Sequence, residues 1–204
     1  MLLFVIGAAI AGRPPDFSAS ARTIVDYLDE DRTRIQVSSA LQVLAVPALV
    51  WFLAAVSSRT PVDTPSRATA NVALVAGAVA GGVFLTDVAA LLVAALRPEN
   101  MAESPELAQA LYDYSWVAPA ASAPLFAAML ASLGTLGLRE PVLWPRWLGW
   151  AGLAAGAAYL LRTGGVFTDE GPFSPDGVLG FYVPIVALLG WVLLASLLLW
   201  RRPA

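Results

Sequence analysis

The sequence contains no cysteine, no histidine and no lysine, so arginine supplies all twelve of its basic residues. Without cysteine and histidine the chain lacks disulfides and the usual ligands of structural zinc and haem. Without lysine it cannot form a Schiff base, which excludes a retinal pigment. No imidazole is available as a general base. Any acid–base chemistry would therefore depend on carboxylates, and no motif for a metal or cofactor is present.

Charged residues are also scarce. They make up 13% of the 204 residues, whereas 58% are hydrophobic, and a soluble domain has about 25% charged residues. The net charge of −3 predicts no basic surface for nucleic acid. The apolar residues form runs long enough to cross about 30 Å of hydrocarbon as helices. The sequence therefore predicts an all-α, polytopic transmembrane bundle in the lipid bilayer.

The hydrophobic runs predict a single membrane domain over residues 1–204, with about six spans and no soluble domain. The predicted helices are 36–58, 69–96, 114–138, 147–163 and 178–200, with a partial helix at 1–12. The first run is apolar throughout but reaches only about 18 Å as a helix. We interpret it as part of a membrane helix whose native start lies before Met1. A signal peptide is the alternative, although no positive segment precedes the apolar stretch.

Arginine density in the loops predicts the orientation. The segments after the second, fourth and sixth helices are short and contain only two acids, and their arginines are Arg59, Arg67, Arg139, Arg146, Arg201 and Arg202. The other three segments contain six arginines and twelve acids over a longer stretch. The positive-inside rule places the short segments in the cytoplasm. Both termini are then cytoplasmic, in a protein of the cytoplasmic (inner) membrane.

Local patterns predict further details of the helices and loops. Ser104-Pro105-Glu106 and Ser174-Pro175-Asp176 each resemble a helix start, with a capping serine, proline at the first helical position and an acid nearby. Residues 19–34 predict an amphipathic surface helix with a Glu30–Arg34 pair. Trp144, Trp147 and Trp150 predict a membrane interface at the start of the 147–163 helix. Small residues at helical spacing predict close helix packing, and they are Gly77 with Gly81, Gly152 with Gly156, and Ala123 with Ala127 and Ala131.

Asp87 is the ionisable residue that lies well inside a predicted span. Intramembrane acids are costly and usually face the bundle interior, a cavity or a partner. One interpretation is a site for a proton or cation. The other is a structural role, in which a protonated Asp87 bonds to a neighbouring helix or pairs with Arg162 or Arg97.

Prolines occur in three predicted helices, at Pro47, Pro119, Pro124 and Pro184. Each kinks its helix and frees a backbone carbonyl. Kinked helices around Asp87 would open a pocket, for which we predict a lining of Gln42, Tyr114, Tyr182 and Arg162. Proline is also common in membrane helices generally. The alternative interpretation is therefore that these prolines are tolerated in their helices and form no pocket.

Several motifs are similar to those of a family of uncharacterised six-helix membrane proteins of high-GC bacteria. They are Asp16–Ser20, Ala110-Leu111-Tyr112-Asp113, Pro145–Trp150, Gly171–Pro175 with Gly177, and the ending from Trp191 to Arg202. The resemblance covers nearly the whole chain and implies a multi-pass bundle. It implies no activity. Members usually begin with a complete first helix.

Three functions fit these observations. The first is binding or transport of a small apolar or cationic solute, without enzymatic activity. The second is a structural or accessory subunit, which packs against another membrane protein or a second copy through small-residue helix faces. The third is a carboxylate-based enzyme acting on a lipid, which is disfavoured because the dense acids lie in the segments predicted outside the cytoplasm, where nucleotide co-substrates are scarce.

The predicted orientation can be tested with single cysteines, because the chain has none of its own. Cysteine placed at Ser18 or Ser104 should react with a membrane-impermeant thiol reagent in intact cells, and cysteine at Ala204 should react only after the cells are lysed. Labelling of the Ala204 cysteine in intact cells would contradict the predicted topology.

Overall fold

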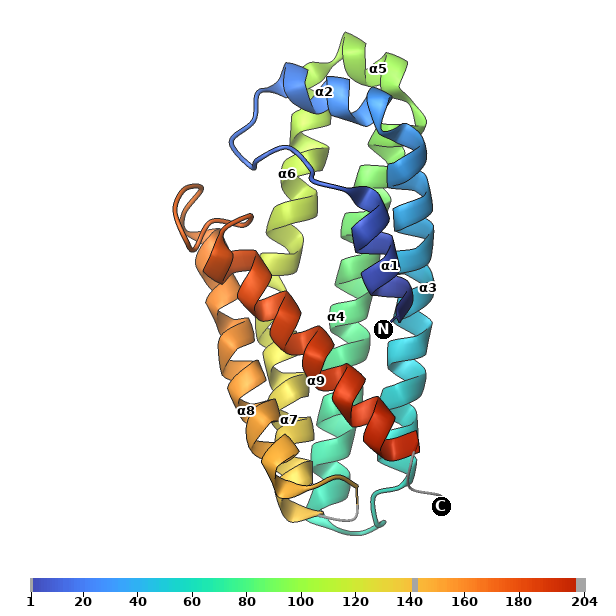
Figure 1. Ribbon diagram of the computed structural model, residues 1–204, viewed down its shortest axis with the longest axis vertical. Coiled ribbons are helices and arrows are strands. Elements are labelled where there is room, and N and C mark those ends of the chain that lie inside the picture. Colours follow the sequence, from blue (N-terminus) through green and yellow to red (C-terminus); the bar gives the residue numbers. More distant parts are fainter. Residues whose placement is uncertain (1, 141–142, 201–204) are drawn as a thin grey trace.

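The computed structural model describes residues 2–140 and 143–200. Within them the chain is helical and contains no strand (Figure 1). The elements are α1 (Leu2–Ala11), α2 (Ala21–Glu30), α3 (Arg32–Ser58), α4 (Pro65–Leu96), α5 (Pro98–Glu103), α6 (Pro105–Ala121), α7 (Ala123–Arg139), α8 (Arg146–Leu160), η1 (Leu161–Val166), η2 (Val178–Tyr182) and α9 (Val183–Trp200). Arg201 and Arg202, which contribute to the predicted orientation, lie outside the described residues. We call the end of the bundle that carries α2 and α5 the cap end.

Four helical stretches are long and apolar enough to cross a membrane, which confirms an all-helical membrane-type fold. They are Arg32–Ser58, Pro65–Leu96, Pro105–Arg139 and Val178–Trp200. The third corresponds to the predicted 114–138 helix but is broken into α6 and α7 at Ser122. Pro119 and Pro124 flank the break, and each lacks the N–H that a continuous helix requires. Shorter apolar helices, α1 and α8, pack against these stretches.

The small residues bring helix backbones together, as the sequence predicted. A Cβ on Gly156 would lie 3.0 Å from the Ala127 carbonyl and 3.3 Å from the Ala131 nitrogen, so two of the predicted stripes pack on one another. Gly77 instead leaves room for the side chains of Leu53 and Met129, which would meet a Cβ at this position. Close approach replaces the hydrophobic effect as the source of helix attraction inside a membrane, because dispersion contacts increase as backbones near each other.

Trp144, which was predicted to mark a membrane interface, is covered by protein and does not face the membrane surface. Its side chain is fully buried and meets the Trp191 ring edge-to-face, with 5.6 Å between ring centroids. The indole N–H of Trp191 donates to the Leu148 carbonyl at 2.8 Å. The exposed Trp147 and Trp150 remain the rings available to the membrane surface.

Helix α2 lies across the cap end as the predicted surface helix (Figure 1). Ile24 and Leu28 are buried beneath it, and Ser20 caps its first turn through a 3.2 Å hydrogen bond from the Thr23 N–H. Burial, together with the charge of Asp31, raises the pKa of Tyr27 to about 12.

The predicted Glu30–Arg34 pair is wrong, because α2 ends at Glu30 and a new helix begins at Arg32. This change of direction separates the two side chains. Arg34 pairs with Asp31 instead, at 2.9 Å.

The expected helix start at Ser174 is also wrong, whereas α6 does begin at Pro105 with Ser104 before it. Residues 171–177 form turns, and the chain becomes helical only at Val178. Gly180 packs so tightly on this turn that a Cβ there would collide with the Ser174 carbonyl. Gly171 supplies the positive φ, 85°, that the turn after Asp169 requires.

The close contact between α7 and α8 predicts that alanine substitution will affect stability very differently at Gly134 and at Gly190. A Cβ on Gly134 would lie 2.7 Å from both the Gly149 carbonyl oxygen and the Leu153 nitrogen, which are backbone atoms that cannot rotate away. We expect Gly134→Ala to destabilise the protein by about 1–3 kcal/mol. Gly190→Ala is the control, because a Cβ on Gly190 would meet no neighbouring element within 4 Å and alanine favours the helix.

Thermal unfolding in detergent measures both variants. Equal stability of Gly134→Ala and Gly190→Ala would show that α7 and α8 do not approach as closely as described.

Candidate functional site

Asp87 is buried inside the bundle, with 4% of its surface exposed. It lies nine residues before the end of α4 at Leu96, about 14 Å from that end along the helix. An ionised aspartate at such a depth costs about 2.5–3.5 kcal/mol on insertion scales. This cost is avoided if Asp87 is protonated, and it is reduced if a neighbouring positive charge offsets it.

Arg162 carries the positive charge that acts on Asp87. It lies in η1, directly after α8, and is 3% exposed. Its guanidinium carbon lies 5.1 Å from the centre of the Phe181 ring, within the range of a cation–π interaction. Its Nη1 approaches the Gly180 carbonyl at 3.5 Å. Its Nε is buried and has no hydrogen-bond partner among the described residues.

The position of Arg162 follows from the proline in the next helix. Pro184 has no N–H, so it cannot donate to the carbonyl of Gly180 four residues earlier. The chain also widens into a π turn over Val178–Tyr182 at this point. A freed carbonyl inside a membrane protein needs another donor, and the guanidinium of Arg162 occupies that place.

Asp87 of α4, Tyr159 of α8 and Arg162 of η1 form one electrostatic group. The charges of Asp87 and Arg162 act on each other and on the buried Tyr159 hydroxyl. The carboxylate and the guanidinium are nevertheless not in contact, because the only ion pairs within 4 Å among residues 2–140 and 143–200 lie elsewhere. We call these three residues the buried charge site.

A chain of aromatic rings connects this site to the cap end. Tyr27 of α2 meets Tyr112 of α6, which meets Trp116, which meets Phe181 beneath Arg162, with centroid distances of 6.4, 6.3 and 5.3 Å. All three pairs are edge-to-face, the favoured arrangement of aromatic side chains. The rings fix Phe181 as a flat surface below the guanidinium.

The structure brings two of the five predicted site residues together, Asp87 and Arg162. Gln42 lies apart on α3, where its amide donates to the Ser38 hydroxyl at 2.8 Å. Tyr114 is 45% exposed and shares a 2.9 Å hydrogen bond with Thr86. Tyr182 is 56% exposed on η2. These three side chains therefore do not surround Asp87.

Sequence reasoning missed Tyr159, Gly180 and Phe181. Pro184 was the available signal, because it identifies Gly180 as the carbonyl that needs a new donor. Nothing in the residue pattern indicated that the chain folds back so that η1 lies beside η2. This arrangement depends on the turn at residues 167–177.

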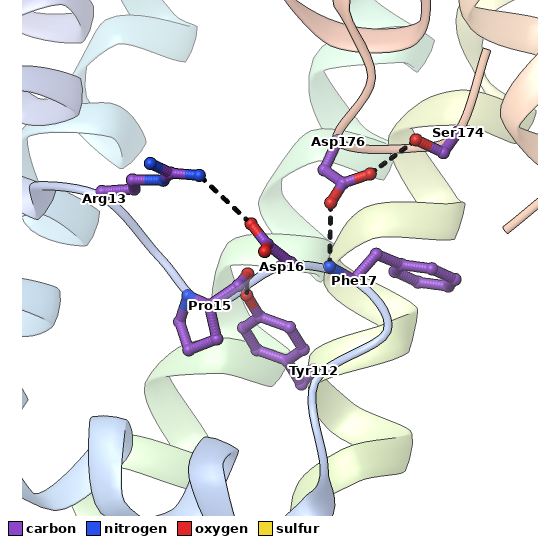
Figure 2. Close-up of polar contacts among 7 residues, drawn as sticks. All are labelled: Arg13, Pro15, Asp16, Phe17, Tyr112, Ser174 and Asp176. Carbon is purple, nitrogen blue, oxygen red and sulfur yellow. Dashed lines mark hydrogen bonds and ion pairs between the residues drawn. The ribbon is translucent and has the colours of Figure 1, made fainter. Parts of the chain in front are cut away.

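A second polar cluster holds the loops at the cap end together, and Figure 2 shows its members. The Asp176 carboxylate accepts hydrogen bonds from the Phe17 N–H at 2.9 Å and from the Ser174 hydroxyl at 2.6 Å. The Tyr112 hydroxyl donates to the Pro15 carbonyl. The linker between α1 and α2 is thereby fastened both to α6 and to the turn before η2. We call this cluster the loop clasp.

Comparison with protein-family models, with curated proteins and with solved structures finds no match. The function therefore has to be inferred from the site itself.

The loop clasp predicts a loss of stability in acid. Burial alone would raise the pKa of Asp176, but the hydrogen bonds from Ser174 and Phe17 outweigh it and lower the pKa. The carboxylate therefore stabilises the fold above its ordinary pKa of about 3.9, and this contribution disappears as the pH falls through the lower native value. We expect Asp176→Asn to cost about 1 kcal/mol at pH 7.

The difference between Asp176→Asn and the parent should shrink below about pH 4, as measured by thermal unfolding across pH. Asp169→Asn, in an exposed acid of the same loop, is the control and should change little. A difference that persists unchanged into acid would rule out the carboxylate as its source.

Proposed function

We propose that the chain is a binding protein of the cytoplasmic membrane and that the buried charge site receives a small polar solute. The proposal includes six membrane-embedded helical segments, both termini in the cytoplasm and the cap end outside. The observation that supports it most directly is the guanidinium of Arg162, which is 3% exposed, has an Nε without a partner among the described residues and does not touch its counter-charge.

The chemistry of the two charges defines the solute. Arg162 offers N–H donors and no acceptor, whereas Asp87 offers acceptor oxygens and, when protonated, one O–H donor as well. A solute between them therefore needs a carbonyl or similar oxygen for the guanidinium and an N–H or O–H for the carboxylate. This differs from the apolar or cationic solute expected from Asp87 alone, because the nearby guanidinium repels a cation.

Access to the site requires movement, since both charged side chains are buried. The segment from η1 to η2 closes the site from the cap end, and it is built of a 3-10 helix, turns and a π turn rather than of regular α-helix. Irregular helical segments beside buried polar groups are typical of membrane binding sites. The loop clasp would hold this segment closed, because Ser174 and Asp176 lie within it.

Thermal unfolding with three small probes tests the proposal. Acetamide carries both a carbonyl oxygen and N–H donors, ethylammonium is a cation and toluene is apolar. We expect acetamide to raise the unfolding temperature of the parent, because a ligand that binds only the folded state stabilises it. Arg162→Lys keeps the charge but loses the planar set of donors, so the acetamide effect should largely disappear.

Arg97→Lys is the matched control, because Arg97 is an exposed arginine at the cap end of α4, and it should respond like the parent. Stabilisation by ethylammonium or toluene, without an effect of acetamide, would support the solute expected from the sequence and defeat this proposal. Asp87→Leu should cost about 1–3 kcal/mol through its unpaired neighbours, whereas Asp87→Asn should fold normally. A fully stable Asp87→Leu protein would show that Asp87 is not buried.

A further inference from the structure

Three buried polar atoms without a hydrogen-bond partner lie on two elements that pack against each other. They are a carboxylate oxygen of Asp113 on α6, and the Nε of Arg162 and the hydroxyl oxygen of Thr163 on η1. In the described part of the chain, the indole nitrogen of Trp144 alone shares this condition. Buried polar atoms nearly always have a partner, so each exception needs an explanation. Three exceptions on α6 and η1 indicate a surface that meets polar molecules.

These polar atoms extend from the buried charge site toward the cap end. Thr163 follows Arg162 in η1, and Trp116 of α6 meets Phe181 beneath the Arg162 guanidinium. Asp113 lies three residues before Trp116 and therefore shares that face of α6. Helix α6 begins at the cap end, directly after α5, so Asp113 lies about 4.5 Å closer to that end than Trp116 does. The charge site thus continues outward along the contact of α6 with η1.

The turn over residues 171–177 covers η1. A Cβ on Gly164 would lie 3.2 Å from the Phe173 Cβ, and a Cβ on Gly165 would lie 3.2 Å from the Pro175 Cα. The turn therefore rests directly on the η1 backbone, and displacing it would uncover η1.

This turn keeps its own shape and has few attachments to distant parts of the chain. Within it, the Ser174 N–H donates to the Gly171 carbonyl at 3.1 Å, and the Gly177 N–H donates to the Ser174 carbonyl at 2.9 Å. Among the described residues, one hydrogen bond joins the turn to a distant segment, from the Phe17 N–H to Asp176 (Figure 2). A compact turn with a single distant hydrogen bond is suited to open and close as a unit.

The loop clasp lies beside the unpartnered polar atoms. Tyr112, whose hydroxyl donates to the Pro15 carbonyl, directly precedes Asp113 in α6. Phe17 and Pro15 belong to the same linker, so this linker is fastened both to α6 and to the turn (Figure 2). Release of the clasp would free the turn and the linker together, next to Asp113.

We propose that Asp113 and Thr163 line the entrance through which a solute reaches Arg162, and that residues 171–177 form a lid held shut by the loop clasp. The proposal rests on the proposed function for the identity of the ligand, and it narrows the class of that ligand. An ionised Asp113 repels anions at the entrance, and the Arg162 guanidinium repels cations at the site. The passage therefore favours a small polar solute without net charge.

Thiol labelling of the full chain in lipid nanodiscs tests the lid without any solute. Thr163→Cys places a thiol at the entrance of a chain that has no cysteine of its own. A water-soluble methanethiosulfonate should label it slowly while the clasp is intact. Asp176→Ala removes both hydrogen bonds to the carboxylate. It should raise the labelling rate about fivefold to tenfold, because these bonds favour the closed lid.

Two matched variants distinguish opening of the lid from unfolding of the protein. Asp169→Ala removes an exposed acid of the same loop and should leave the labelling rate of Thr163→Cys unchanged. Ser122→Cys places a thiol at a buried position between α6 and α7, and its labelling should not respond to Asp176→Ala. If Thr163→Cys does not fold, Asp113→Cys reports on the same entrance.

Reagents of opposite charge test the part played by Asp113. With the clasp released by Asp176→Ala, the rates at which a cationic and an anionic methanethiosulfonate label Thr163→Cys are compared. Asp113→Asn should lower the ratio of the cationic to the anionic rate about threefold, because the entrance loses its negative charge. Glu106→Gln, in an exposed acid at the start of the same helix, is the control and should leave the ratio unchanged.

Several results would overturn the proposal. Equal labelling of Thr163→Cys with an intact and a broken clasp would show that the clasp holds no lid. A parallel rise at Ser122→Cys would show that the clasp stabilises the whole fold and gates nothing. An unchanged charge ratio in Asp113→Asn would place the entrance elsewhere. Because no labelling step needs a solute, failure of acetamide to bind would defeat the proposed function and leave the labelling results standing.

Discussion

A backbone carbonyl that loses its helical donor inside a membrane has to be satisfied by another group, and this constraint shapes both notable features of the molecule. Pro184 frees the Gly180 carbonyl, and Arg162 approaches that carbonyl from the interior. The burial of a guanidinium then requires a counter-charge and a flat surface, which Asp87 and Phe181 provide. Pro47 frees the Val43 carbonyl on α3, in an apolar groove lined by α3 and α4 where no described side chain reaches it. The requirement is thus met by a buried guanidinium in one place and by no described side chain in the other.

The broad architecture could be predicted from the sequence because it depends on the local distribution of apolar residues. The long helices at α3, α4 and α9 lie close to the predicted 36–58, 69–96 and 178–200, and α2 is the expected surface helix. The small residues at Gly156, Ala127 and Ala131 pack as predicted because close approach is a property of residue size and spacing. The errors fall where the chain changes direction. Neither the break between α6 and α7 nor the turns before Val178 could be located by periodicity, since prolines are compatible with both kinks and breaks.

The candidate site was predicted only in part, for a related reason. Asp87 was evident from its position in an apolar run, and Arg162 could be named as its counter-charge. The arrangement of Gln42, Tyr114 and Tyr182 depends on the rotation of each helix about its axis, and these side chains do not surround Asp87. A polar side chain near the middle of a membrane helix can face lipid, a neighbour or the interior, and hydropathy alone does not distinguish these. Trp144 illustrates the same difficulty, because a tryptophan expected at the membrane surface fills the core against Trp191.

Helix α4 forms a wall of both the groove and the buried charge site. Leu85 lines the groove and Asp87 belongs to the charge site. Residues two apart on a helix are separated by about 200° around its axis, so the two surfaces lie on opposite sides of the same turn. No charged residue separates them, and the turn contains no glycine or proline at which the helix could bend independently. The turn that carries Leu85 and Asp87 therefore takes part in fixing the distance between Asp87 and Arg162. Because that distance decides whether the carboxylate and the guanidinium meet each other or a bound solute, the position of α4 is the physical quantity that both surfaces share.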